Sequence, residues 1–75
     1  MDLREVLASN LRRLRHAKSL SQDDLAYDAK VSRSYLSQLE KGAFYASLRI
    51  IERLAKVLDV PPAELLKVPK SNKQR

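Results

Sequence analysis

Four polar side chains on one face of a predicted helix are the residues of this sequence best suited to recognising another molecule. They are Arg33, Ser34, Ser37 and Gln38. An arginine can donate two hydrogen bonds to O6 and N7 of guanine, and a glutamine can both donate and accept, as N6 and N7 of adenine require. Serine is short enough to let a helix approach while it bonds to a base or a phosphate. The pattern predicts contact with base edges in a DNA major groove, and its alternative is an ordinary solvated helix face.

The stretch from Ser21 to Gly42 predicts the two short helices that would position this face. Ser21 has the character of a helix N-cap, with Asp24 completing a short-armed capping box, and Ser32 repeats the N-cap signal. Each start also has an apolar pair that can close as a hydrophobic staple: Leu20 with Leu25, and Val31 with Leu36. Only residues 29–31 remain between the helices, which favours a helix-turn-helix over a hairpin of long helices.

This stretch resembles the helix-turn-helix of the phage repressor and Cro (C1-type) proteins, often called the XRE family. The resemblance rests on Leu20-Ser21-Gln22, Leu25-Ala26, Val31-Ser32, Tyr35-Leu36 and Leu39-Glu40-Lys41-Gly42, with Arg15, Ser47-Leu48, Ala55 and Leu65-Leu66 outside the motif. It implies an all-α fold, a compact five-helix repressor-like bundle, and base contacts from Arg33, Ser34 and Gln38, with Ser37 beside them. The segments 25–27 and 32–35 also look like those of the controller proteins of restriction–modification systems.

The resemblance assigns further roles to Gln22, Arg15 and Glu40. The family residue matching Gln22 clamps the DNA backbone, and the free N–H groups of a helix start favour a phosphate; otherwise Gln22 is only the first residue of its helix. The residues matching Arg15 and Glu40 form a salt bridge that would fix the angle of the recognition helix. Three more residues are expected to contact phosphates: Lys41, Tyr35 and Tyr45. The alternative for Tyr35 is half-buried packing, and the alternative for Tyr45 is a loop residue without a specific contact.

Apolar spacing predicts the remaining helices. The first is capped by Asp2, with Glu5 completing the box, and ends near residues 18–19. Its apolar stripe consists of Leu3, Leu7, Leu11 and Leu14. The motif helices span about 22–29 and 33–41. A fourth helix starts at the cap Ser47 and is expected to bury Leu48, Ile51, Leu54, Ala55 and Leu58. A short fifth helix follows Pro61-Pro62 and runs to residue 66.

Two turn positions and the chain end complete this outline. Lys30 stands where the family usually has a glycine in the left-handed conformation, and a positive φ at this lysine would cost about 1 kcal/mol. Gly42 supplies a left-handed helix stop. Residues 1–67 are predicted to form one DNA-binding domain. Residues 68–75 are predicted to be a disordered basic tail, because they contain almost no apolar side chains.

Composition limits the classes of function. The 75 residues carry a net charge of +6, but residues 67–75 alone carry +4, so charge supports a nucleic-acid partner less strongly than the motif does. There is no cysteine, His16 is the only histidine, and no serine has an obvious base partner. An enzyme, a metal site and a cofactor are therefore not expected, and no small-molecule ligand is evident. No membrane-length apolar run or signal peptide is visible, which suggests a cytoplasmic, nucleoid-associated protein.

The function expected from these observations is sequence-specific transcriptional regulation on double-stranded DNA. A single module reads few base pairs, so a homodimer on a palindromic operator is the usual solution. Candidate residues for the dimer interface are Phe44, Ile50, Val57 and Leu65. The alternative is a protein-interaction module, antitoxin-like or an adaptor, built on the same fold.

Overall fold

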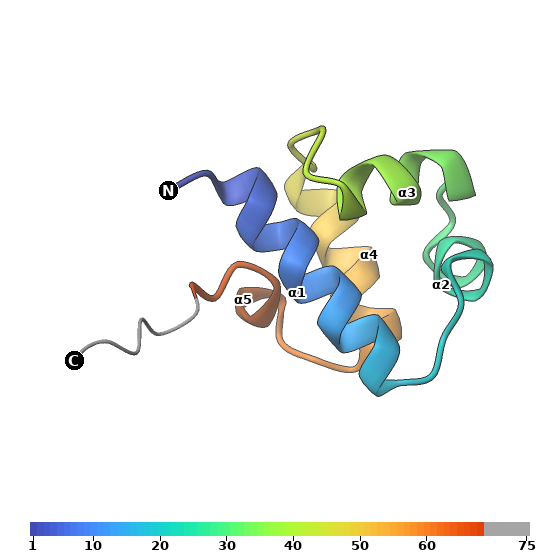
Figure 1. Ribbon diagram of the computed structural model, residues 1–75. Coiled ribbons are helices and arrows are strands. Elements are labelled where there is room, and N and C mark those ends of the chain that lie inside the picture. Colours follow the sequence, from blue (N-terminus) through green and yellow to red (C-terminus); the bar gives the residue numbers. More distant parts are fainter. Residues whose placement is uncertain (69–75) are drawn as a thin grey trace.

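The residues that the structure describes form a bundle of five helices, as the sequence predicts (Figure 1). The computed structural model describes residues 1–68, and within them there is no β-strand. The helices are α1 (Leu3–Ala17), α2 (Gln22–Ala29), α3 (Arg33–Glu40), α4 (Leu48–Leu58) and α5 (Pro62–Leu65). Figure 1 shows α3 along one edge of the bundle, with α2 beside its beginning. The tail expected at 68–75 lies, from residue 69 onwards, outside the described residues.

Serine side chains begin the three central helices. The Ser21 hydroxyl accepts from the Asp24 N–H at 3.0 Å, and the Asp24 carboxylate accepts from the Ser21 N–H at 3.2 Å, which completes the predicted capping box. The Ser32 and Ser47 hydroxyls accept from N–H groups at the third position of α3 and α4. At α1 the predicted capping box with Glu5 does not form, because the Asp2 carboxylate accepts from the backbone N–H and the guanidinium of Arg4 instead.

Left-handed residues end the helices and turn the chain. Lys30 adopts φ 63°, the left-handed conformation of the glycine that the family usually has there, and Gly42 adopts φ 76°, as predicted. Ser19 and Asp59 also have positive φ, at 57° and 58°. A side chain in this conformation costs about 1–2 kcal/mol, less for aspartate, which can hydrogen-bond locally. The bundle therefore carries some conformational strain in exchange for sharp turns between short helices.

A core of leucines joins all five helices. Those with almost no exposed surface are Leu11, Leu25, Leu36, Leu39, Leu54, Leu58 and Leu65. Each contributes about 1.5–3 kcal/mol by leaving water. Helix α1 packs against α3 and α5, while α2 packs against α3 and α4. The helix-turn-helix is thus held from behind by α1 and α4, which leaves the outer side of α3 uncovered.

The predicted apolar stripes are wrong at two positions near helix starts. Leu48 was expected in the core, but its side chain is 76% exposed, and Leu3 is also exposed. Both leucines continue the apolar spacing of their helices. They lie in the first turn, however, where no other helix of residues 1–68 covers the apolar face. Spacing identifies the face of a helix, whereas burial also requires a neighbouring element over that face.

A buried polar residue attaches the last helix to the first. Asn10 is 4% exposed, and its Nδ2 donates to the carbonyls of Leu65 and Lys67 at 2.9 and 3.0 Å. Its Oδ1 accepts from Arg13 at 3.2 Å. The bonds from Nδ2 satisfy the carbonyl of the last residue of α5 and a carbonyl just beyond the end of that helix. The sequence offered one signal for this contact, which is a polar side chain next to an apolar stripe.

Candidate nucleic-acid interface

Helix α3 separates an inner apolar face from an outer polar face. Its buried residues are Leu36, Leu39 and Glu40. Of the four residues predicted to contact bases, Arg33 and Ser34 are exposed, and Ser37 and Gln38 are half-buried. All four belong to one helix of eight residues and keep some surface open to solvent. The arrangement leaves room for a partner along the outer side of α3. The major groove of DNA is wide enough to admit an α-helix of this kind.

An ion pair links α3 to α1 beneath this face. The Glu40 carboxylate accepts from Nε of Arg15 at 2.7 Å and from its Nη2 at 3.0 Å. The side chains are only 3% and 11% exposed. The third nitrogen, Nη1, donates to the carbonyl of Leu20 at 2.9 Å, just before α2 begins. This arginine therefore connects three parts of the motif through one planar group.

The same network holds the carboxyl group of Glu40 ionised. Burial alone raises the pKa of Glu40, but hydrogen bonds from Arg15 and Gln22, together with the positive charge of Arg15, outweigh it and leave the pKa below its usual range. The hydrogen bonds to Glu40 raise the pKa of Arg15, against the opposing effect of burial. Both groups are charged near neutral pH, so the ion pair is intact where the protein would act.

Gln22 is half-buried and belongs to this network. Its Nε2 donates to Oε1 of Glu40 at 3.0 Å, which directs the side chain towards the interior of the motif. An amide nitrogen has two hydrogens, so one remains for a second acceptor. Gln22 is the first residue of α2, where N–H groups without helical partners favour an anion. Its predicted phosphate contact would therefore be made by a side chain whose orientation Glu40 already sets.

A second residue of α1, which the sequence did not predict, also holds the end of α3. Arg12, in the middle of α1, donates from Nη1 to the backbone carbonyl of Glu40. This carbonyl is one of those that a helix leaves without a partner at its C-terminal end. Arg12 lies three residues before Arg15, so both arginines reach the end of α3 from one side of α1. An arginine repeated at this spacing was the signal available in the sequence.

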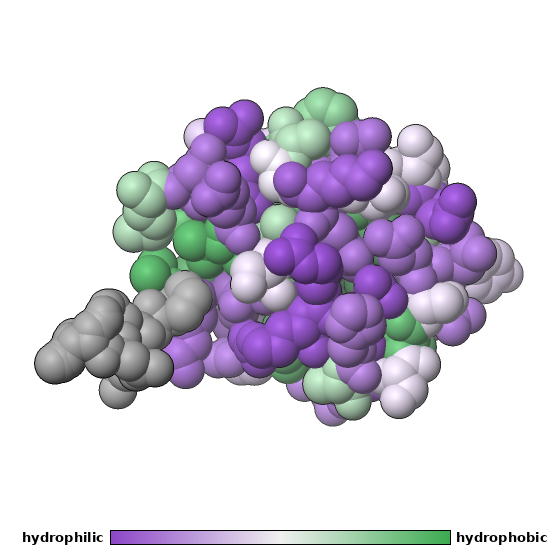
Figure 2. All heavy atoms as spheres, viewed as in Figure 1, coloured by the Kyte–Doolittle hydropathy of each residue, from purple (hydrophilic) through white to green (hydrophobic). Residues whose placement is uncertain are grey.

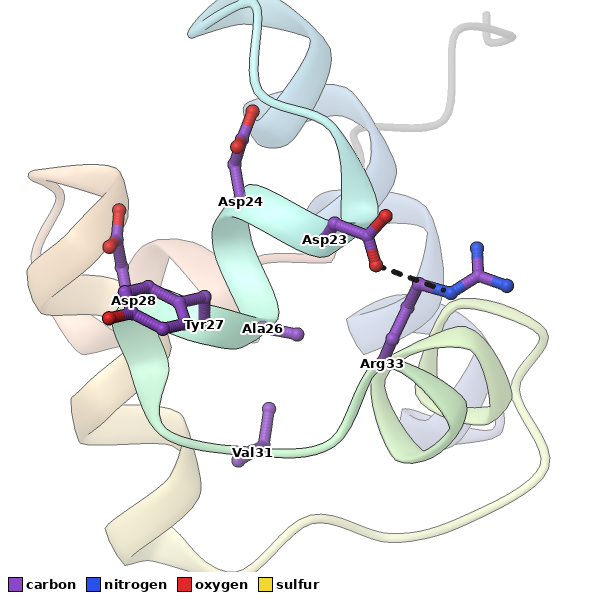
Figure 3. Close-up of a pocket in the computed structure, with 7 residues that line it drawn as sticks. All are labelled: Asp23, Asp24, Ala26, Tyr27, Asp28, Val31 and Arg33. Carbon is purple, nitrogen blue, oxygen red and sulfur yellow. Dashed lines mark ion pairs between the residues drawn. The ribbon is translucent and has the colours of Figure 1, made fainter.

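A surface ion pair connects the beginnings of α2 and α3. Nε of Arg33 lies 3.3 Å from Oδ1 of Asp23. Both side chains are largely exposed, at 63% and 76%. Figure 3 shows this pair at the edge of a shallow hollow between the two helices, with the terminal guanidinium nitrogens of Arg33 directed away from Asp23. No role was predicted for Asp23 from the sequence.

The residues predicted as further phosphate contacts lie in different surroundings. Tyr35 is half-buried, and its ring stacks on Phe44 with centroids 6.2 Å apart, which agrees with the packing alternative. Tyr45 is exposed, and the guanidinium of Arg4 lies over its ring at 5.0 Å from the centroid. Lys41 is exposed at the end of α3. Within the described residues, Tyr35 has a stacked ring beside it and Tyr45 has a guanidinium over it, whereas Lys41 has neither kind of contact.

Apolar side chains gather on a surface near the N-terminus. They line a groove between the starts of α1 and α4 and the end of α5, with a volume of about 170 Å³. The groove residues are Leu3, Arg4, Leu7, Tyr45, Ala46, Leu48, Ile51 and Leu66. Figure 2 shows apolar residues at this end of the molecule against a mostly hydrophilic face.

The residues predicted for a dimer interface need one correction. Leu65 has no exposed surface, because α5 packs it into the core of its own chain, so its side chain cannot contact a partner. Ile50 and Val57 are half-buried against the core, and Phe44 is 47% exposed. Periodicity could not reveal the burial of Leu65, because a helix of four residues has no repeat from which to infer a face.

Other kinds of site find little support in the described chain. His16 is exposed. Residues 1–68 contain no group of three or more histidine, cysteine, aspartate or glutamate side chains that could hold a metal ion. Among the same residues, every helix is too short or too polar to cross a bilayer.

The comparisons with known proteins agree with this geometry. Residues 6–67 match a family model described as a helix-turn-helix domain. The chain is 36% identical over 66 residues to control protein C.BamHI of Bacillus amyloliquefaciens, covering 87% of this chain and 82% of that protein. The structure of the restriction-modification controller protein C.AhdI from Aeromonas hydrophila is similar, with a TM-score of 0.80 and 42% identity over 83% of this chain and 94% of that one. So is that of a hypothetical transcription factor from Neisseria, with a TM-score of 0.87 and 40% identity over 91% and 78% of the two chains.

Proposed function

This chain belongs to the helix-turn-helix family of DNA-binding transcriptional regulators, and from that premise we propose that it binds an operator as a homodimer, with α3 in the major groove of each half-site. One observation carries the proposal. The outer side chains of α3 are open to solvent, while its inner end is attached to α1 by Arg15 and Arg12. A helix held at a fixed angle can present the same donors and acceptors to each operator it meets.

The individual contacts follow from the chemistry of the exposed groups. Arg33 has the donors for guanine, and Gln38 has the donor and acceptor for adenine. Ser34 and Ser37 allow close approach of the helix. Phosphate contacts by Lys41 and by Gln22 would position α3, since backbone contacts set register without carrying sequence information. In this proposal Tyr35 supports the recognition helix through its stacking on Phe44.

In the proposed homodimer, the apolar groove contacts the second copy of the chain. A second copy of the chain would cover the exposed side chains of Leu3, Tyr45 and Leu48, which a monomer leaves in water. On an operator the two copies of α3 would read half-sites about 34 Å apart, one helical turn of DNA. Phe44, Ile50 and Val57 keep some accessible surface and remain candidates for the same interface.

The names of the relatives suggest a narrower role, the control of a restriction–modification system. We include this role in the proposal, together with a location in the cytoplasm at the nucleoid. A protein-interaction module, such as an antitoxin or an adaptor, would use the groove to bind a different protein, and it is the second candidate because the same exposed leucines favour it.

Selection from a pool of randomised duplexes tests the proposal. Rounds of binding and amplification should enrich two half-sites with approximate two-fold symmetry. Affinity for the enriched sequence should fall steeply as salt increases, because bound phosphates release counterions. A pool that yields no consensus would refute sequence-specific binding and favour the interaction module. A single half-site, bound by a monomer, would refute the homodimer alone.

A further inference from the structure

The ion pair between Asp23 and Arg33 joins the second residue of α2 to the first residue of α3. It uses only Nε of the guanidinium, at 3.3 Å from Oδ1. The two terminal nitrogens point away from Asp23 (Figure 3). They are the parts of the arginine that can meet a base end-on, as a fork of parallel N–H groups.

From this geometry we infer that Asp23 is a positioning residue, which holds Arg33 so that both terminal nitrogens meet O6 and N7 of one guanine. The inference rests on the proposed function, and it adds a determinant of specificity that does not itself touch DNA. An arginine loses side-chain freedom when it makes a bidentate contact. An ion pair formed before DNA arrives removes part of that freedom in advance.

Two simpler explanations of Asp23 make different predictions. A carboxylate in the first turn of a helix is favoured by the helix dipole, and in that role its loss would change stability only. A negative charge near DNA also weakens binding, and in that role its loss would strengthen binding to every sequence alike. Only a positioning role changes the preference for guanine over the other bases.

Asp28 provides a matched control for Asp23. It lies on the same helix, it is exposed, and it lines the same hollow. Within residues 1–68 it forms no ion pair. Asp23→Asn and Asp28→Asn therefore remove the same charge from the same region, and only the first removes the partner of Arg33. Asp24 is unsuitable as a control, because it completes the capping box with Ser21.

The experiment measures base discrimination rather than affinity alone. Fluorescence anisotropy at one salt concentration would give the Kd of the full chain for its selected duplex and for duplexes with each other base at the guanine assigned to Arg33. Asp23→Asn should reduce the preference for guanine by about twofold to fivefold, the range expected for losing one exposed ion pair. Asp28→Asn should keep the wild-type preference. Equal preference ratios in the two variants would overturn the inference, whatever their melting temperatures.

The Arg33→Ala background separates this inference from the proposed function. If Asp23 acts through Arg33, then Asp23→Asn has no guanine preference left to reduce in Arg33→Ala. A further change of base preference in the double variant would overturn the inference, because Asp23 would then act by another route. If Arg33→Ala weakens all duplexes equally, the base contact in the proposed function fails first. If it relaxes one base while Asp23→Asn behaves like Asp28→Asn, only the positioning role fails.

Discussion

Glu40 at the end of α3 accepts two hydrogen bonds from Arg15 in the last turn of α1, at 2.7 and 3.0 Å. This ion pair is almost completely excluded from solvent. It lies directly beneath the helix that carries the proposed base contacts. The pair therefore joins the end of α3 to α1, and we expect it to affect both the stability of the bundle and the orientation of its binding face.

Glu40→Gln should strongly destabilise the protein. It leaves the buried guanidinium of Arg15 without a compensating charge, which costs about 3–5 kcal/mol for a buried pair. Urea unfolding followed by circular dichroism would measure the loss. Asp59→Asn is the control, because it breaks an exposed pair with Lys18 at 4.0 Å, and asparagine accepts the left-handed backbone at this position. Similar losses in both variants would show that burial does not strengthen the Arg15–Glu40 pair.

Stability should also fall at acidic pH in a way that depends on Glu40. Its folded pKa lies below the value of 4.5 for an unperturbed glutamate, so the unfolded chain binds the extra proton first. The stabilisation is complete above that value and is lost as pH falls through the lower, folded pKa. Unfolding free energies measured between neutral and strongly acidic pH should decline less steeply in Glu40→Gln than in the wild type. Parallel curves for the two proteins would contradict the lowered pKa.

Arg33→Ala should relax one position of the operator. Loss of a bidentate guanine contact costs about 1–3 kcal/mol on the selected site and little on sites that already lack the guanine. Lys41→Ala is the comparison, since loss of a phosphate contact weakens all duplexes alike and lowers the salt slope by about 1. Repeating the selection with Arg33→Ala would measure the first effect, and Kd values at several salt concentrations would measure the second for Lys41→Ala. An unchanged consensus with Arg33→Ala would remove this residue from base recognition.

Leu48→Glu should shift the protein towards the monomer. It puts a charge into the apolar groove without disturbing the core, because the side chain is already mostly exposed in a single chain. Sedimentation velocity would measure the mass, and circular dichroism would check that the fold survives. Tyr27→Glu is the control, because Tyr27 is 84% exposed and does not line this groove. If Leu48→Glu sediments as the wild-type dimer, the interface lies elsewhere, with Phe44, Ile50 and Val57 as the remaining candidates.

Local signals explain which features the sequence could predict. The N-caps at Ser21, Ser32 and Ser47 depend on contacts within one helical turn, so their residue types announce them. The left-handed conformation of Lys30 matches that of the glycine which the family resemblance places at this position. In the same way, Arg15 and Glu40 were paired by resemblance, since nothing local links residues that are 25 positions apart.

The features that could not be predicted from the sequence depend on which helices pack against one another. The exposed Leu48 and the buried Leu65 have the spacing or the apolar character expected of them, but their burial is set by how α1, α4 and α5 pack together. The contacts of Asn10 with α5 and of Arg12 with the end of α3 join elements far apart in sequence. Side chains of these types are common on helix surfaces, so composition gives no indication of their partners.

Three surface turns hold the backbone in a conformation that lowers the stability of the folded chain. Ser19, Lys30 and Asp59 hold the backbone in the left-handed region without being glycine, and such positions each reduce stability by about 1–2 kcal/mol or less. Net stabilities of small domains are only about 5–15 kcal/mol, and proteases act on the unfolded fraction. Each 1.4 kcal/mol changes that fraction about tenfold. The copy number of this protein would therefore respond to residues that lie outside both the base-reading face and the groove.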